Sequence, residues 1–154
     1  MKYILFFLLT VSMTGLGCSS AKKNKSSVIK QGLTGLITEA TGNQMPMKGA
    51  APQVPRGILT NVFIYEPTNL TQVNRIGTSA IYTAINTHLV ASVATDSTGA
   101  FSLALPVGSY SVFIQRGKQF YANLFDTNNN IALFTVEENK LTTVHLTVSS
   151  SASY

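Results

Sequence analysis

The sequence predicts an all-β protein, an antiparallel two-sheet sandwich of seven or eight strands in one domain. Thr, Ser, Val and Tyr are frequent, 45% of residues are hydrophobic, 11% are charged and Trp is absent. This composition is typical of β proteins. Apolar residues also recur at every second position in several segments, and turn-forming residues separate these segments. A chain of 154 residues has room for one hydrophobic core.

The clearest strand pattern occupies residues 95–114. Apolar side chains alternate with polar or small ones on both sides of Pro106 and Gly108, at Phe101, Leu103, Leu105, Tyr110, Val112 and Ile114. Proline fixes φ and cannot donate to a β-ladder, and glycine accepts backbone conformations that other residues avoid, so both are typical of connections. The pattern predicts a β-hairpin with one apolar face.

The turn before this hairpin is predicted from its own residues. Asp96 can accept hydrogen bonds from backbone amides two or more residues further on, and Gly99 can adopt the positive φ that a tight connection requires. This Asx-turn needs no ligand. We therefore expect Asp96 to have a structural role and not a binding or catalytic one.

The spacing T-D-x-x-G-x-F-x-L-x-L-P-x-G-x-Y-x-V resembles the carboxypeptidase regulatory-like domain, a small transthyretin-like β-sandwich. The residues that match are Thr95, Asp96, Gly99, Phe101, Leu103, Pro106, Gly108 and Tyr110. A first strand and turn of that family are matched at Gly35, Ile37, Thr41, Gly42 and Pro46. The resemblance covers about residues 32–148 and implies a transthyretin-like arrangement of strands.

The start of the chain has the features of an export signal. Met1 and Lys2 precede about ten apolar residues, a length typical of a secretory signal and too short to span a bilayer. Residues 15–18, Gly-Leu-Gly-Cys, resemble the lipobox of bacterial lipoproteins, which implies cleavage before Cys18 and lipid attachment to it. Residues 1–17 are thus expected to be a signal peptide. Ordinary secretion with an unmodified Cys18, the only cysteine, is the alternative.

Residues 18–31 are polar, basic and without periodicity, which predicts a lipidated flexible tether. The tether holds Lys22, Lys23, Lys25 and Lys30, whereas residues 32–154 contain as many acidic as basic residues. The net charge of +5 therefore does not indicate a basic face for nucleic acid. The tether lysines either contact anionic lipid head groups or are simply solvated.

The domain, residues 32–149, begins with a short strand at residues 32–38 in which Leu33 and Leu36 or Ile37 are available for burial. Proline and glycine predict a long loop at residues 47–57. The strand at 61–66 is apolar on both faces, which indicates a central position or an edge covered by a loop. Residues 67–88 form an insertion, and their pattern leaves a strand and a helical turn equally open.

The second half of the domain is predicted to consist of strands joined by short polar turns. Residues 131–136 and 141–148 are expected to form a closing hairpin. Residues 150–154 are expected to be a short tail. The remaining expected elements are a strand at 89–95, a turn at 115–119, a strand at 120–125 and a polar loop at 126–130.

One candidate metal site lies in this polar loop. Asp126, Asn128, Asn130 and Glu137 occupy positions 1, 3, 5 and 12 of an EF-hand-like loop, a spacing that suits oxygen ligands for Ca²⁺. However, Ile131 occupies the position that requires glycine, and no helices are predicted to flank the loop. An Asn-rich turn is the preferred interpretation, so we expect no metal and no other cofactor.

The histidines do not indicate an enzyme. His88 and His145 are the only two, and His145 alternates with apolar residues, so we expect it on the solvent face of a strand. One transthyretin-like enzyme, hydroxyisourate hydrolase, would require paired histidines and a YRGS-like carboxy terminus. This chain ends in Ser-Ala-Ser-Tyr and contains no G-x-S-x-G nucleophile motif. We therefore expect no catalytic activity, unless both histidines meet a carboxylate in one pocket.

A further local match concerns modification. Asp96, Ser97 and Thr98 resemble the O-glycosylation site of Bacteroidetes proteins, with Ser97 as the candidate acceptor. The same three residues are also explained by the turn.

These observations predict a non-catalytic lipoprotein of a Gram-negative envelope, of the Bacteroidetes type. It would be anchored to the outer membrane through acylated Cys18, on the periplasmic face, and would act as a scaffold or protein-interaction module for an envelope partner. The alternative is glycan or small-ligand binding through the loops at 47–57 and 67–88. That alternative needs an exposed aromatic platform, for which the supply is Tyr65, Tyr82, Tyr121 and Phe125.

Overall fold

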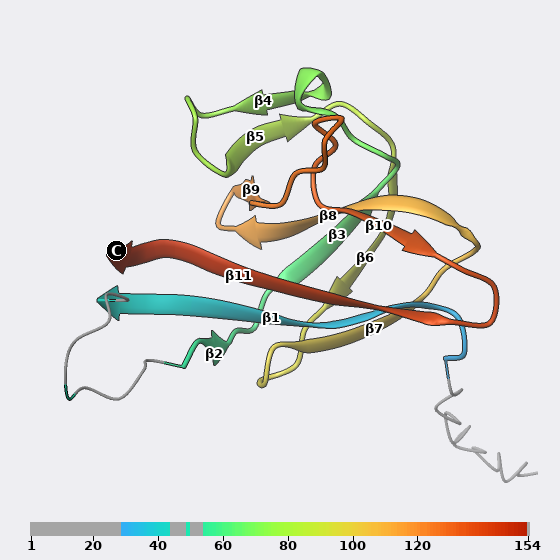
Figure 1. Cartoon of the computed structure of the whole chain (residues 1–154), viewed down its shortest axis with the longest axis horizontal. Coiled ribbons are helices and arrows are strands. Elements are labelled where there is room, and N and C mark those ends of the chain that lie inside the picture. The colour runs from blue at the N-terminus through green and yellow to red at the C-terminus, as the bar shows by residue number, and fades with distance from the viewer. Residues whose placement is uncertain (1–28, 44–48, 50–53, 154) are drawn as a thin grey trace, which may run out of the picture.

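The computed structural model describes residues 29–43, 49 and 54–153, which form two β-sheets packed face to face (Figure 1). The predicted all-β sandwich is confirmed. Within these residues the one helical element is a single 3-10 turn, and no helix is long and apolar enough to cross a membrane.

The smaller sheet has four strands and is built around β1, Gly32–Asn43. β11, Leu141–Ser153, pairs with β1 in parallel along one side. β7, Ala100–Ala104, and β2, Arg56–Gly57, share the other side of β1 and are antiparallel to it. Thus β11 continues through residues 150–153, where the sequence suggested a tail.

The larger sheet has seven strands in the order β4-β5-β9-β8-β3-β6, with β10 also paired to β8. Its strands are β3 Asn61–Tyr65, β4 Val73–Arg75, β5 Ile81–Ile85, β6 Leu89–Ala94, β8 Gly108–Arg116, β9 Gln119–Tyr121 and β10 Leu133–Val136. β3 lies between β8 and β6, so it takes the central one of its two predicted positions. The strands outnumber the expected seven or eight because β2, β4 and β9 are only two or three residues long.

The predicted hairpin across Pro106 and Gly108 is wrong. β7 pairs with β1, so that Leu103 lies opposite Leu33, whereas β8 pairs with β3 in the other sheet. The connection therefore carries the chain from one sheet to the other. The hydroxyl of Tyr110 donates to the carbonyl oxygen of Pro106 at 3.1 Å and holds this crossing in place.

The predicted closing hairpin is wrong for the same reason. β10 pairs with β8 in the larger sheet, while β11 pairs with β1 in the smaller one. Alternating apolar residues only require that one face of each strand be buried. A strand in either sheet satisfies that requirement, because the inner faces of both sheets line the same core.

The insertion at 67–88 forms both of the structures that the sequence left open. A 3-10 turn at Leu70–Gln72 is capped by the side chain of Asn69, which accepts from the amide of Thr71 at 3.2 Å. β4 and β5 follow as an antiparallel pair, and β5 joins the larger sheet through β9. The insertion is thus an ordered extension of the sheet.

Two hydrophobic clusters lie on opposite faces of the larger sheet. The inner cluster fills the space between the sheets and includes Leu33, Ile37, Val112 and Ile114, all fully buried. The outer cluster is aromatic and includes Tyr65, Tyr82, Phe113 and Ile131. In the outer cluster, edge-to-face ring pairs lie 5.4 to 6.3 Å apart, a geometry that stabilises aromatic packing.

Candidate functional site

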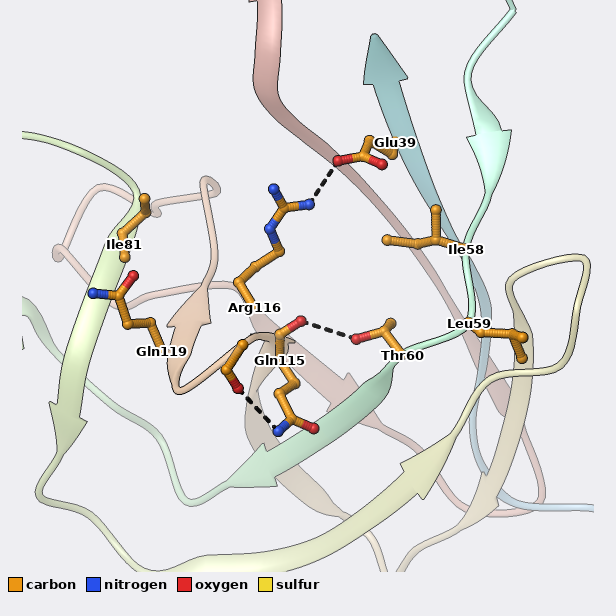
Figure 2. Close-up of a pocket in the computed structure, with 9 residues that line it drawn as sticks. Glu39, Ile58, Leu59, Thr60, Ile81, Gln115, Arg116 and Gln119 are labelled. Atoms are coloured by element: carbon orange, nitrogen blue, oxygen red, sulfur yellow. Dashed lines mark hydrogen bonds and ion pairs between the residues drawn. The ribbon is translucent and has the colours of Figure 1, made fainter.

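A cleft of about 570 Å³ opens at one end of the sandwich, between the two sheets (Figure 2). β1 contributes Glu39, and the ends of β8 and β9 contribute Arg116 and Gln119. The remaining wall comes from residues 58–60, from Ile81 and from the turn after β8. The cleft therefore lies next to the two loops that the sequence proposed for ligand binding.

An ion pair spans this cleft. Figure 2 shows Arg116 reaching toward Glu39, and its Nη1 donates to Glu39 Oε1 at 2.6 Å. The side chains remain 31% and 26% exposed, so solvent screens their attraction and the pair adds little to stability. Beside it, Thr60 Oγ1 donates to the carbonyl oxygen of Gln115 at 2.9 Å.

The cleft combines one ion pair with amide, hydroxyl and apolar side chains. Its only carboxylate is already paired with a guanidinium, and its nine lining residues include no His, Cys or Ser. Among the lining residues, the groups of the type used as acid, base or nucleophile are Glu39 and Thr60. Glu39 is ion-paired, and the hydroxyl of Thr60 donates to the carbonyl oxygen of Gln115. Gln119 contributes a side-chain amide beside apolar residues of the lining, a combination that suits a small polar molecule. The amide of Gln115 is already bonded to Asn61 and to the carbonyl oxygen of Gly117.

A second feature is the open edge of the larger sheet at β6. The amide of Thr95 donates to the carbonyl oxygen of Thr60 at 2.9 Å, which sets the positions that face β3. Because backbone direction alternates along a strand, the N–H and C=O groups of Ser92 and Ala94 point away from β3. In the described part of the chain, no strand pairs with β6 on that outer side.

The β6 edge lacks the features that usually block strand addition. Its sequence, LVASVA, contains no charged residue and no proline, and Leu89 and Val90 are 43% and 37% exposed. Natural edge strands are commonly protected by lysine, proline or a covering segment. The exception is a bulge near the start of β6, where Val90 is the extra residue opposite the step from Ile64 to Tyr65 of β3.

The edge of β11 differs because side chains cover it. The hydroxyl of Tyr121 donates to the carbonyl oxygen of Thr147 and accepts from the amide of Ser149, both at 3.4 Å. Asn123 Nδ2 also donates to Thr147, at 3.5 Å. These contacts occupy part of the outward-facing backbone of β11.

The predicted turn at Asp96 is confirmed. Asp96 Oδ1 accepts from the amide and hydroxyl of Thr98 at 2.8 and 2.6 Å, and from the amide of Ala100 at 3.0 Å. These donors, the Thr98 hydroxyl foremost, lower the pKa of Asp96. Gly99 has φ of +83°, as expected. Ser97 is exposed in this turn, where a modifying enzyme could reach it.

The candidate metal ligands are used within the protein. Asp126 Oδ1 accepts from the amides of Asn128 and Asn130, both at 2.8 Å, and Oδ2 accepts from Asn130 Nδ2 at 2.8 Å. The Asn130 side chain is the main cause of the lowered pKa of Asp126. Glu137 pairs with Lys140, which lowers the pKa of Glu137 and raises that of Lys140. This arrangement supports the interpretation of an Asn-rich turn.

The described residues contain no cluster of candidate metal ligands. No group of three or more His, Cys, Asp or Glu residues that could hold a metal occurs among them. His145 is exposed on β11 of the smaller sheet, on the solvent face as predicted, whereas His88 is exposed just before β6 of the larger sheet.

The aromatic residues do not form the platform that glycan binding would need. Tyr65, Tyr82 and Tyr121 are buried, and burial raises the pKa of Tyr65 and Tyr82. Phe125 is 41% exposed, but the guanidinium of Arg75 lies 5.5 Å above its ring. Three of the four candidate rings are thus unavailable to a ligand.

Several predicted features lie wholly or partly outside the described residues, among them the signal peptide at 1–17 and most of the tether at 18–31. Cys18 belongs to the segment 1–28, and most of the loop at 47–57 is outside as well. Of that loop, the structure describes Gly49 and residues 54–57, which include β2.

The cleft was not predicted, and neither was the identity of the strand that has the open edge. The cleft is built from five separate segments, so no local pattern announces it. The edge did have a local signal, because LVASVA contains no charged residue and no proline. Which strand lies at an edge, however, depends on the topology.

Comparison of the chain with protein-family models, with curated proteins and with solved structures gives no significant match. The resemblance to the carboxypeptidase regulatory-like domain therefore remains an inference from the motif at Thr95 to Val112.

Proposed function

We propose that this chain is a non-catalytic, lipid-anchored envelope protein whose sandwich binds another protein by strand addition. In this proposal the domain is of the carboxypeptidase regulatory-like, transthyretin-like type. Acylated Cys18 holds it at the periplasmic face of the outer membrane, and residues 18–31 form the tether. The sandwich then presents its open edge to an envelope partner.

The observation that supports this function best is the β6 edge. A partner strand placed beside β6 gains main-chain hydrogen bonds at Ser92 and Ala94 without displacing any strand of the described fold. Strand addition to an exposed sheet edge is a general mode of peptide recognition. The burial of Tyr65, Tyr82 and Tyr121 supports a scaffold over a glycan platform.

Site-specific photo-crosslinking in intact cells tests the binding function. A photo-reactive amino acid at Ser92 is expected to give a discrete crosslinked protein species, because that position faces outward from the open edge. The same amino acid at Thr143 is the matched control, since Thr143 is an exposed residue of the β11 edge. No species from Ser92, or the same species from both positions, would contradict the proposal.

Metabolic labelling tests the anchor separately. Palmitate is expected to label the wild-type chain and not the Cys18→Ala variant, and the variant is expected to leave the membrane fraction. Equal labelling of both chains would show that Cys18 is not the acylated residue. Sedimentation of intact outer membranes then tests the location.

A second candidate function, small-ligand binding, is favoured by the cleft at the sandwich end. We propose a small, polar, uncharged ligand that binds without aromatic stacking, because the cleft offers the amide of Gln119 and its two opposite charges already neutralise each other. A panel of mono- and disaccharides can be screened by the rise in melting temperature. Binding is expected to weaken in Gln119→Ala and to be unchanged in Lys118→Ala, which lies outside the lining.

A further inference from the structure

We infer that the strand that adds to β6 carries bulky apolar side chains on both of its faces, and that it belongs to a different protein rather than to a second copy of this chain. This inference rests on the proposed function. It specifies the partner's chemistry at the same edge.

The backbone groups of β6 set where the partner lies. Ser92 and Ala94 direct their N–H and C=O groups outward, so two residues of β6 can each exchange a pair of hydrogen bonds with an added antiparallel strand. A parallel strand would use the same groups with a slanted pattern. In either direction, the added strand becomes the new edge of the larger sheet.

The side chains on the inner face of β6 leave space beside the core. Ala91 and Val93 are partly buried and pack against the inner cluster. Next to them lies a groove of about 430 Å³. Its apolar lining consists of Val93, Ala94, Ala100 and Phe101, and its polar lining consists of Thr34, Asp96 and Ser102. An inward-facing side chain of the added strand would lie over this groove. A large apolar side chain would remove more apolar surface from water there than a small one.

The outer face of β6 also leaves apolar surface exposed to solvent. Ser92 lies opposite Phe63 of β3, and Phe63 is only partly buried although it packs against the outer aromatic cluster. Leu89, on the same face, is 43% exposed. Because Ser92 is small, a bulky side chain of the added strand can reach across it to the ring of Phe63.

A second copy of this chain does not supply these side chains. Pairing β6 with itself would place Ala91, Ser92 and Ala94 beside the same small residues. The groove on the inner face and the exposed apolar surface on the outer face would then both stay uncovered. A six-residue edge also buries far less surface than the roughly 1,200 Å² or more of a stable interface unless large side chains take part. The β6 edge is therefore poorly suited to a homodimer.

Synthetic peptides test this inference on the full exported chain carrying Cys18→Ala, which needs no detergent. The first peptide has eight residues that alternate Ile and Tyr, with a lysine at each end for solubility. The second replaces Ile and Tyr by Ala and Ser. Two further versions of the first carry N-methyl groups on one or the other alternate set of amides, which removes the donors of one edge.

The expected result is at least tenfold tighter binding of the Ile/Tyr peptide than of the Ala/Ser peptide. One of the two N-methylated versions should lose binding and the other should keep it. On binding, the amides of Ser92 and Ala94 should exchange with solvent at least tenfold more slowly by NMR. Ser92→Pro, which removes an outward N–H, should weaken binding at least tenfold, whereas Thr143→Pro on β11 should not.

Several results would overturn the inference. Equal binding of the two peptides, retention of binding by both N-methylated versions, or no binding of any peptide would each do so. So would slower amide exchange at Ser102 and Ala104 on β7, or at Thr143 and His145 on β11, in place of β6. Self-association that protects Ser92 without peptide would instead identify a second copy as the occupant. A crosslinked partner at Ser92 together with any of these results would retain the proposed function and reject only the partner chemistry.

Discussion

The same turn occurs twice in this protein, once after Asp96 and once after Asp126. In each turn the aspartate amide donates to the carbonyl oxygen four residues later, at 2.8 and 3.1 Å. The carboxylate accepts from the amides two and four residues later. The residue three positions later has a positive φ, Gly99 in the first turn and Asn129 in the second.

The surroundings of the two turns differ. The Asp96 turn carries the chain from β6 to β7, and Gly99 is buried against the smaller sheet, where its carbonyl oxygen accepts from the amide of Ile37 at 2.8 Å. The Asp126 turn lies on the outer face of the larger sheet, and Asn129 is exposed. It contacts residues 69–70 through the bond from the amide of Leu70 to the carbonyl oxygen of Asn129, at 3.1 Å, and the bond from Asn69 Nδ2 to the carbonyl oxygen of Asn128, at 2.6 Å.

This difference explains the residue choice at the third position. A positive φ alone accepts asparagine as well as glycine. A Cβ on Gly99, however, would lie 2.1 Å from the carbonyl oxygen of Ile37, which is backbone and cannot move aside. The local hydrogen bonds define the turn, and the neighbouring strand makes glycine obligatory in one copy only.

Exchanging the residues at positions 99 and 129 should have the largest effect on the free energy of unfolding. Gly99→Asn installs the residue that the other turn uses, so the φ preference changes little and the clash with Ile37 dominates. We expect a loss of about 3 kcal/mol or more in the free energy of unfolding, measured by urea denaturation. The reverse change, Asn129→Gly, should stay within about 0.5 kcal/mol of the wild type.

Equal effects of the two substitutions would show that the strand contact does not matter. If Gly99→Asn gives no folded protein, Gly99→Ala is a milder variant for the same comparison, with Asn129→Ala as its control. Gly99→Ala should again be the more destabilising of the two.

The same comparison shows what the sequence can and cannot predict. The Asp96 turn was predicted because its donors and acceptor lie within five residues of one another. The hairpin across Pro106 was wrongly predicted because pairing is not local: Leu103 meets Leu33, about seventy positions away. Alternation at Phe101 and Leu103 correctly indicated a buried face, but it holds no information about the partner strand.

The candidate sites show the same contrast between local features, which the sequence predicts, and long-range pairing, which it does not. The alternative interpretation of Asp126 and Asn130 as an Asn-rich turn came from the missing glycine at Ile131, a local feature. The cleft between Glu39 and Arg116 joins positions in β1 and β8 that only the packing of the two sheets brings together. The open edge at Ser92 likewise depends on which strands do not pair.

Removing the carboxylates should lower the stability less than exchanging the residues at positions 99 and 129. The variant of the first turn should again be the more destabilised of the two. Asp96→Ala and Asp126→Ala each abolish the side-chain hydrogen bonds of one turn. The unfolding midpoint in urea should fall in both variants and fall further in Asp96→Ala, because Asp96 holds the connection that places Gly99 against β1. A larger fall in Asp126→Ala would reverse the assignment of the structurally critical turn.

Acid should weaken both turns. The pKa values of Asp96 and Asp126 are lowered in the folded state by the hydrogen bonds that they accept. A lowered pKa adds stability above the unfolded value of about 3.9, and this stability is lost as the pH falls through the folded value. Between pH 6 and pH 3 the urea midpoint should therefore fall.

Asparagine variants identify the source of this pH dependence. Asp96→Asn and Asp126→Asn keep an acceptor oxygen but do not titrate, so each should flatten the profile in part. The double variant should keep a residual slope of the same sign from Glu137, whose pKa Lys140 lowers. An unchanged slope in the double variant would contradict the role of these two carboxylates. Thr98→Ala should reduce only the contribution of Asp96 to the pH dependence, since the Thr98 hydroxyl is the main donor to Asp96.

The smallest effect on stability is expected at Ser97, where the two turns differ in chemistry and not in geometry. Ser97 is exposed between Asp96 and Thr98, and the equivalent residue of the other turn is Thr127, also exposed. We propose glycosylation of Ser97 because only the first turn has the Asp-Ser-Thr tripeptide. The protein isolated from its native envelope should then be heavier than its processed sequence and lipid require. Ser97→Ala should remove the excess mass without shifting the unfolding midpoint, whereas Thr127→Ala should retain it. An intact mass with no excess in the wild type would reject the modification and leave Asp96 and Thr98 with their structural role alone.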